Sequence, residues 1–596
     1  MLDTQRPLYY GTSGPRDAKI VIVGESWGER EAAEQSPFVG PSGNELNRIL
    51  QESGINRNTV LCTNTIAERP LNNETWRFFI PKSQGANLRR VGGLIPSSLV
   101  ESELRRLYMQ LADRPRDLVI AAGNYSLWGL SRCTGAQTIR ESNGRRVPEA
   151  LQTFGPTGIM DWRGSMIYID RHMAYGDIPP TRLLPIIHPA AIIRQWSQRA
   201  PTIHDLKTRI HQALRNDWRP KPAPLLLTLP SFNDTIDTLQ KWLDRAKRES
   251  YDLACDIETL RHEFISCIGF ADSSSFAISI PFVSSQNPEG GFESYWSPAQ
   301  EAQILSLLRQ VLSHPSIRII GQNFIYDTQF IQHWFGVTPR LDFDTMLAQN
   351  VVFPGTPKDL GYLSSLYCQY HWYWKDDVKD WRRLGGLKEL LEYNCIDVLR
   401  TWEIAQSQKA YIKSIDQEEQ MQFKMQTNQL CLRMMNRGVL FDKQRAGTML
   451  FELQAALTAF HQELLGIIPQ EMVKPHGKKK EAFWYSSPKQ TAELLYDILG
   501  MQVVSHRKTG NRTVGKEALM VLERKYPEFT GLFRRLDYAG STANTAGVIQ
   551  TSVEADGRMR CSYNPGGTET HRLSSSENVF GRGTNLQNLS KGEEDD

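Results

Sequence analysis

The chain has 596 residues, of which 40% are hydrophobic and 23% are charged, a composition typical of a folded protein with several domains. Its 69 basic and 66 acidic residues give a net charge of only +3, so any nucleic-acid-binding surface must be local. The eight cysteines form no C-x-x-C pair, which argues against a disulfide framework or a zinc ribbon and fits a reducing cytoplasm. No signal peptide and no bilayer-spanning apolar run are visible, so no membrane partner is expected.

Residues 1–216 have the pattern of one α/β domain. An amphipathic helix is predicted at 43–54, and strands are predicted at 19–24, 59–64, 117–123, 165–169 and 182–187. Apolar strands that alternate with helices favour a mostly parallel sheet covered on both faces, which is a doubly wound fold. Such sheets bind ligands in the loops that follow their strands.

Three of those loops carry residues of interest. The loop GESWGEREAAEQSPFVGPSG contains Glu25 and Phe38, TNTIAERP contains Asn64, and HPAAIIRQW begins at His188. Together they resemble the family four uracil-DNA glycosylases over most of residues 19–215. The resemblance implies that Phe38 stacks on an extruded base, that Asn64 hydrogen-bonds its edge, and that His188 approaches the deoxyribose and the base oxygen.

The domain also departs from that family. Ser26 and Trp27 replace a small residue and a proline, Ala32 stands where an acid is common, and Ala190 replaces a serine. Glu68 occupies the position of an iron–sulfur cysteine, so no cluster is expected. We therefore expect a pocket that recognises a flipped base, with weak or absent glycosylase activity.

A proline-rich segment, residues 217–230, is the predicted linker to the next domain. It carries prolines at 220, 222, 224 and 230, and proline-dense chain is extended and semi-rigid. The next domain is then expected at 231–405.

Residues 231–405 contain four carboxylates of interest, which come from three separate segments of the sequence. In LACDIETL, Asp256 and Glu258 lie two apart on a predicted strand and so share a face. Asp327 begins a helical pattern in IIGQNFIYDTQF, and Tyr393 and Asp397 lie four apart on a predicted helix. Hard divalent cations take oxygen ligands, and two of them roughly 4 Å apart can clamp the attacking and leaving oxygens of an in-line displacement.

In this order and spacing the segments resemble the three exonuclease motifs of the proofreading domain in family A DNA polymerases. The resemblance implies a ribonuclease-H-like α/β fold that holds two Mg²⁺ or Mn²⁺ ions on the four carboxylates. Tyr393 would orient the attacking water and Asn323 would contact DNA. The reaction would be stepwise hydrolysis of a strand from its 3′ end. For Asp342 and Asp344, we prefer capping of the helix that follows over metal ligation.

Residues 406–596 are predicted to be mostly helical, with an amphipathic helix that ends at Gly438. Two basic loops flank SSPKQTAELLYDILG. Clustered charge is commonly a solvated face, but these loops resemble the thumb of family A polymerases, which implies contacts with duplex phosphates. The basic residues concerned are Lys478, Lys479, Lys480, Lys508 and Arg512.

The final stretch, CSYNPGGTETHRLSSSENVFGRGTNLQNLSKG, resembles the beginning of the polymerase palm. His571 replaces a glycine of that pattern, and Arg572 would lie against the primer–template. The palm acids and the fingers of the family follow this point. We therefore expect the N-terminal part of a phage-type family A polymerase, either truncated or split from a separately encoded polymerase half.

These observations predict a replication and proofreading protein. It would act as a 3′–5′ exonuclease in the cytoplasm, of the host if phage-encoded, on single-stranded 3′ ends and primer–template duplex. The alternative is a non-catalytic DNA-binding platform that positions a separate polymerase subunit. Four intact acids in the exonuclease motifs favour the enzyme.

Overall fold

The computed structural model divides the chain into two compact units, Met1–Met425 and Gln426–Asp596. None of the helices it describes is long and apolar enough to cross a membrane. The described residues are 7–81, 94–131, 139–142, 145–148, 158–169, 181–214, 224–260, 262–286, 292–375, 387–468, 487–506, 510–550 and 553–588.

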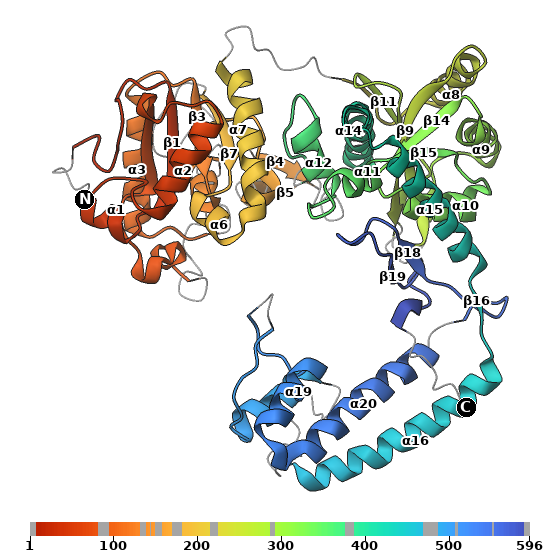
Figure 1. Ribbon diagram of the computed structural model, residues 1–596. Helices are drawn as coiled ribbons and strands as arrows, with labels where there is room; N and C mark the ends of the chain where they lie inside the picture. The colour runs from red at the N-terminus through yellow and green to blue at the C-terminus, as the bar shows by residue number, and fades with distance from the viewer. Residues whose placement is uncertain are drawn as a thin grey trace. The chain divides into compact units, whose positions relative to one another are not determined.

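The first domain of the first unit is built on a five-stranded sheet of order β2-β1-β3-β7-β6 (Figure 1). Neighbouring strands are parallel except β6, which runs antiparallel to β7 at the edge. This arrangement confirms the predicted mostly parallel sheet. The strands are β1 (Ile20–Ser26), β2 (Val60–Ile66), β3 (Leu118–Ala122), β6 (Ile167–Ile169) and β7 (Thr181–Ile186).

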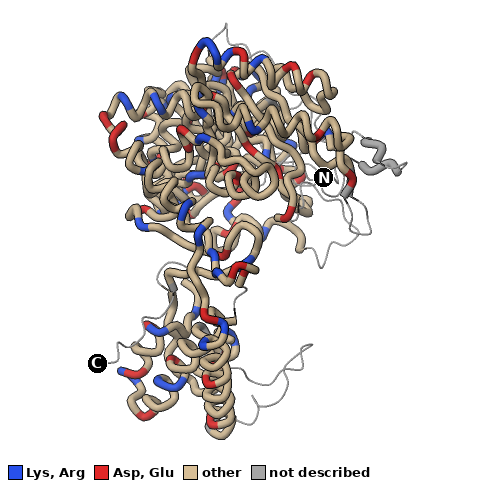
Figure 2. The backbone as a smooth tube through the Cα atoms, turned by 90° about the vertical axis from the view of Figure 1, so that its right-hand side faces the viewer, with Lys and Arg blue, Asp and Glu red and all other residues tan. Residues whose placement is uncertain are grey.

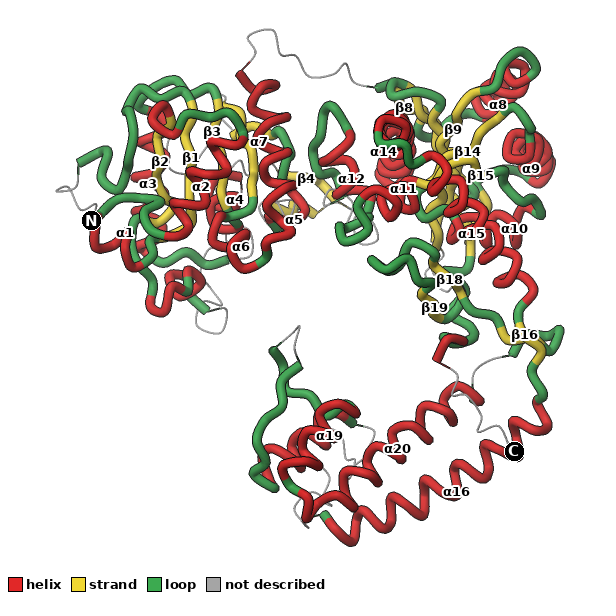
Figure 3. Tube along the Cα trace, in the orientation of Figure 1, coloured by secondary structure: helices red, strands yellow, loops and turns green. Residues whose placement is uncertain are grey.

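Helices cover both faces of this sheet (Figure 3). Because alternate strand residues point to opposite faces, β1 sends Val21 and Val23 into the core formed with α3 and α4. It sends Ile20 and Ile22 into the core formed with α2, α6 and α7. The domain is therefore doubly wound. Its helices are α1 (Glu29–Glu34), α2 (Pro41–Glu52), α3 (Ser98–Ala112), α4 (Asn124–Ser131), α5 (Ile159–Trp162), α6 (Pro189–Arg194) and α7 (Arg199–Leu214), and β4 (Ile139–Ser142) pairs with β5 (Arg145–Pro148).

The second domain of this unit has a six-stranded mixed sheet of order β15-β14-β9-β10-β11-β8. Strands β9, β10 and β11 form an antiparallel meander, β14 and β15 extend it in parallel beside β9, and β8 runs parallel to β11. This is the arrangement expected of a ribonuclease-H-like domain. The strands are β8 (Leu225–Leu227), β9 (Tyr251–Leu260), β10 (Phe264–Ala271), β11 (Phe276–Pro281), β14 (Ile317–Gly321) and β15 (Leu341–Asp344), with β12 (Val283–Gln286) and β13 (Phe292–Ser294) as a separate pair.

The long helix α14 packs across β9, β10 and β11. It runs through residue 405, the predicted domain limit, whereas the compact units divide after Met425, within α15. The predicted end of α15 is confirmed, because Gly438 follows it with a left-handed φ of 64°. The helices are α8 (Phe232–Ala246), α9 (Pro298–Ser313), α10 (Ile325–Phe335), α11 (Thr345–Val352), α12 (Leu360–Tyr367), α14 (Leu387–Ser414) and α15 (Glu418–Arg437).

The second unit is mostly helical, as predicted. Helix α16 (Lys443–Ile467) packs along α20 (Thr530–Ile549), and Leu464 and Phe533 lie in the core that they share with α18 and α19. Acidic and basic residues are interspersed along both units (Figure 2), in keeping with the small net charge. The remaining elements are α18 (Pro488–Ala492), α19 (Lys516–Lys525), and the strand pairs β16 (Val439–Leu440) with β17 (Arg558–Met559) and β18 (Ser562–Asn564) with β19 (Ser574–Ser576).

Candidate functional sites

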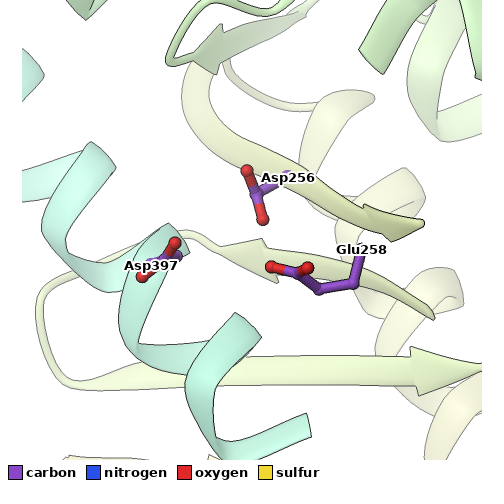
Figure 4. Close-up of side chains that lie close together, drawn as sticks. All are labelled: Asp256, Glu258 and Asp397. Carbon is purple, nitrogen blue, oxygen red and sulfur yellow. The ribbon is translucent and has the colours of Figure 1, made fainter. Parts of the chain in front are cut away.

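Three carboxylates converge between β9 and α14. Asp256 and Glu258 project from one face of the strand toward Asp397 on the helix (Figure 4). One oxygen from each of the three carboxylates lies within 4.8 Å of the other two. Because the donors are all carboxylate oxygens, the cluster suits a hard divalent cation such as Mg²⁺ or Mn²⁺.

The electrostatics of this carboxylate cluster also fit a cation. Burial and the neighbouring carboxylates Asp327, Glu258 and Asp397 raise the pKa of Asp256 well above its ordinary value, and Lys375 opposes them. Packed carboxylates of this kind either retain a proton or bind a positive charge. A divalent ion would offset the repulsion.

Asp327 lies beside the cluster but outside it. It is buried in the first turn of α10, and its Oδ1 accepts a hydrogen bond from the Ile257 backbone N–H at 3.0 Å. Burial raises the pKa of Asp327 to about 7. The structure thus brings three of the four predicted ligands together and ties the fourth to the strand that carries two of them.

Asn394 is a site residue that the sequence analysis missed. It is fully buried, and its Nδ2 donates to Asp256 Oδ2 at 2.9 Å while its Oδ1 accepts from Ser279 Oγ at 2.7 Å. A Cβ at Gly269 would lie only 2.3 Å from Asn394 Oδ1, so the glycine makes room for this amide. The signal was available, because Asn394 and Asp397 are three apart and share a helix face.

Trp374 and Lys375 were also missed. The Trp374 indole N–H donates to Asp397 Oδ1 at 2.6 Å. The Lys375 ammonium lies 3.4 Å from Asp397 Oδ2 and donates to the Tyr393 hydroxyl at 3.0 Å. Burial raises the pKa of Tyr393, so its hydroxyl stays protonated. The aromatic and basic run HWYWK, between the second and third motifs, is the sequence feature that could have indicated them.

Asn323 occupies the turn into α10 with a left-handed φ of 53°. Asp344 braces this turn, since its Oδ2 accepts from the Phe324 N–H at 2.8 Å while its Oδ1 caps α11. Capping by Asp344 is therefore confirmed. Asp342 instead lies on β15, 3.7 Å from the Lys409 ammonium, so the capping predicted for it is wrong.

In the first domain, the predicted pocket residues meet at the ends of β1 and β2. The Phe38 ring is buried and stacks on His188 with ring centroids 6.1 Å apart. A Cβ at Gly24 would lie 2.8 Å from the Phe38 ring and 2.7 Å from Asn64 Nδ2, so both side chains line one space. Asn64 Oδ1 is buried with no hydrogen-bond partner among the described residues. Such an oxygen costs about 1–3 kcal/mol, which a donor on a ligand would recover.

Glu31 holds the loop that carries Phe38. Its Oε1 accepts from the Phe38 N–H at 2.5 Å and its Oε2 accepts from the Gly28 N–H at 2.6 Å. Burial raises the pKa of this carboxyl. Glu31, one residue before Ala32, thus fixes the backbone of the loop on both sides of the helix α1 that carries it.

His188 and Glu25 complete the pocket. His188 Nδ1 accepts from the Ala190 N–H at 3.2 Å, and burial lowers the pKa of the imidazole against the opposing effect of Glu25. A neutral ring with an accepting Nδ1 carries its proton on Nε2. Glu25 Oε1 accepts from the Tyr125 N–H at 3.1 Å.

Of the DNA-binding residues predicted in the second unit, the structure describes Arg512 and Arg572. Residues 478–480 and Lys508 lie outside the described residues. Arg512 is paired with Asp497 at 2.8 Å, whereas the Arg572 side chain is exposed. His571 has a left-handed φ of 59°, the conformation that the glycine of the palm pattern adopts freely.

The chain is a multidomain α/β protein with two chemically distinct sites. The site in the second domain consists of carboxylates, and the site in the first domain combines an aromatic ring, an amide and a neutral imidazole. Residues 11–215 match the family model of the uracil DNA glycosylase superfamily. Residues 232–410 match the 3′–5′ exonuclease model of DNA polymerase A. The chain therefore carries a uracil-DNA glycosylase superfamily domain and a 3′–5′ exonuclease domain, as the two resemblances predicted.

Individual relatives agree with the first assignment. The type-4 uracil-DNA glycosylase of Thermotoga maritima is 47% identical over 62 residues, 10% of this chain and 32% of that protein. That of Saccharolobus solfataricus is 43% identical over 61 residues, 10% of this chain and 28% of that protein. The matches thus span about a third or less of these relatives.

Among solved structures, the POL domain of Pol1 from M. smegmatis, in complex with DNA primer-template and dNTP, matches with a TM-score of 0.42 and 19% identity. The match covers 62% of this chain and 56% of that chain. This likeness is too low to assign residues 426–596 to a fold.

Proposed function

We propose that the exonuclease domain hydrolyses DNA stepwise from its 3′ end with two Mg²⁺ or Mn²⁺ ions. The observation that carries the proposal is the convergence of Asp256, Glu258 and Asp397 within 4.8 Å. These residues would hold the ions, and Asp327, adjacent to them, would complete the ligand set. Bound divalent ions supply charge stabilisation for an in-line displacement at phosphorus.

The surrounding side chains have separable tasks. Because Tyr393 keeps its proton, its hydroxyl can donate a hydrogen bond to the attacking water, and Lys375 holds the hydroxyl oxygen at 3.0 Å. Asn394 holds one oxygen of Asp256, and Trp374 holds one oxygen of Asp397. Such preorganisation removes the cost of reorienting the ligands during the reaction.

DNA is the proposed partner of both units. Asn323, on the left-handed turn before α10, would contact the 3′ strand. Arg572, Arg512 and the basic residues 478–480 and 508 would neutralise duplex phosphates, which makes binding sensitive to salt.

For the glycosylase-like domain we propose capture of a flipped uracil, because Asn64 Oδ1 is buried and has no hydrogen-bond partner in the part of the chain that the structure describes. An amide can accept from N3–H of uracil and donate to its O4, while Phe38 stacks on the ring. Stacking on an aromatic side chain is worth about 1–3 kcal/mol per base, which favours a base that is already unpaired. The Nε2–H of His188 would donate to the base oxygen and stabilise a departing base.

The exonuclease proposal is tested with a labelled single-stranded oligonucleotide and Mg²⁺ or Mn²⁺. The parent should shorten it from the 3′ end, and the double variant Asp256→Ala, Glu258→Ala should not, with little loss of folding because the change also removes repulsion. Undiminished activity in the double variant would refute the site. Parent protein that binds DNA without degrading it would support the platform alternative.

The pocket is tested by an abasic-site assay on single-stranded DNA that contains uracil, with the variants Asn64→Ala and His188→Ala beside the parent. We expect uracil-dependent binding that Asn64→Ala weakens, with slow or absent release of the base. Rapid release by the parent, lost in both variants, would show instead a working glycosylase.

A further inference from the structure

The segment 371–375, which we call the connecting segment, is anchored to the glycosylase-like domain. The Tyr373 N–H donates to Ser165 Oγ at 3.1 Å, and the Met166 N–H donates to the His371 carbonyl at 3.0 Å. Ser165 is fully buried. The backbone of the connecting segment is thus held on both sides of Trp372 by two neighbouring residues of the other domain.

Buried arginines fix the helix that precedes the connecting segment. Arg163, paired with Asp205 at 2.6 Å, donates to Ser365 Oγ at 2.7 Å. Arg209 on α7 donates to the carbonyls of Ser365, Cys368 and Gln369, which lie at the C-terminal end of α12 and just after it. Breaking a buried charged network of this kind is costly, so α12 is a rigid support for residues 371–375.

The next two residues of the connecting segment reach the exonuclease carboxylates. Trp374 and Lys375 together engage both oxygens of Asp397, and Lys375 also holds the Tyr393 hydroxyl. The anchored Tyr373 is the immediate neighbour of Trp374. Because consecutive Cα atoms are about 3.8 Å apart, a displacement at Ser165 is transmitted to Asp397 with little chain to absorb it.

We propose that the glycosylase-like domain sets the geometry of the exonuclease site through residues 371–375, with Trp374 and Lys375 as positioning residues for Asp397 and Tyr393. The inference rests on the proposed exonuclease function. It assigns to the first domain a role in the second reaction that is independent of base recognition. Misplacement of a ligand and of the water-orienting hydroxyl should lower kcat and leave binding of the DNA strand unchanged.

The test uses the full chain and a 5′-labelled single-stranded oligonucleotide with saturating Mg²⁺. Trp374→Phe keeps a ring and removes the N–H, and Lys375→Met keeps the length and removes the charge. Both should lower kcat about 10- to 100-fold while KM stays within about twofold. Lys375→Arg should recover part of the loss, which a purely structural role would not predict.

The link between the domains is tested by Ser165→Ala, which removes the acceptor of the Tyr373 N–H. It should lower kcat in the same sense, and its effect should be non-additive with that of Trp374→Phe, because the two residues act on one segment. The matched control is Ser126→Ala, a buried serine of α4 whose hydroxyl donates to the Gly123 carbonyl, far along the chain from the connecting segment. Thermal unfolding checks that each variant is folded.

The outcomes separate the two proposals. An inactive parent would overturn the exonuclease function and this inference with it. An active parent with unchanged kcat in Trp374→Phe, Lys375→Met and Ser165→Ala would overturn the inference alone. Loss of kcat in the first two variants with none in Ser165→Ala would also overturn it, since the site would then be independent of the glycosylase-like domain.

Discussion

Replacing Asn394 with leucine tests one hydrogen bond that orients a carboxylate of the exonuclease site. Leucine has the same branched skeleton as asparagine, with methyl groups in place of the amide oxygen and nitrogen. It therefore cannot donate to Asp256 Oδ2, which lies 2.9 Å from the Asn394 amide nitrogen. It also leaves the Ser279 hydroxyl without the acceptor that it now has at 2.7 Å. Asp256 would lose its orientation relative to Glu258 and Asp397.

The size of the effect follows from the type of bond. A hydrogen bond to a charged group contributes about 1.5–3 kcal/mol, and each 1.4 kcal/mol is about tenfold in rate. This free energy stabilises the arrangement of carboxylates that the reaction needs, so kcat/KM of Asn394→Leu should fall about 10- to 100-fold. The unpaired buried Ser279 hydroxyl should lower the free energy of unfolding by about 1–3 kcal/mol.

The assay measures release of the 3′-terminal nucleotide from single-stranded DNA over a range of Mg²⁺ concentrations. Gly269→Ala is an independent perturbation, because its Cβ would lie 2.3 Å from Asn394 Oδ1 and push the amide away. Ser279→Ala is the matched control, since it leaves the bond to Asp256 and should have the smallest effect on kcat/KM. Folded Asn394→Leu protein with parental kcat/KM at every Mg²⁺ concentration would refute the reasoning.

The remaining predictions concern pH, metal and DNA. Burial and two neighbouring arginines lower the pKa of His204 from 6.5 to about 4. As the pH falls, His204 is therefore protonated in the unfolded state before it is protonated in the folded state. The free energy of unfolding should be highest above pH 6.5 and should decrease by up to roughly 3 kcal/mol as the pH falls toward 4. Denaturant unfolding should show that the free energy of unfolding decreases more between pH 7.5 and pH 5 for the parent than for His204→Gln. Equal decreases would contradict the role assigned to His204. Mg²⁺ should raise the Tm of the parent more than that of the double variant Asp256→Ala, Glu258→Ala, so equal shifts would place the ion elsewhere. Because the Arg512 charge is already paired, Arg572→Ala should weaken duplex binding more than Arg512→Ala in a salt titration, and the reverse order would argue against the contact assigned to Arg572.

Local periodicity was enough to place most of the predicted ligands. Asp256 and Glu258 share a face because strand residues alternate, and β9 presents them as expected. Tyr393 and Asp397 were placed on one helix by their spacing of four, and α14 contains both. The same reasoning identified the strands of the first domain, whose apolar runs become the two-sided core around β1.

What the sequence alone determined, then, is which elements form and which way their side chains face, since both depend on neighbours a few residues apart. The tertiary structure decided which polar groups meet. Asn394 contacts Asp256 across 138 residues of chain, and Tyr373 contacts Ser165 across 208. It also separated Asp327 from the three-carboxylate cluster by tying its carboxylate to the backbone of β9. Such partners are selected by how sheets and helices pack against one another, and no local pattern encodes that packing.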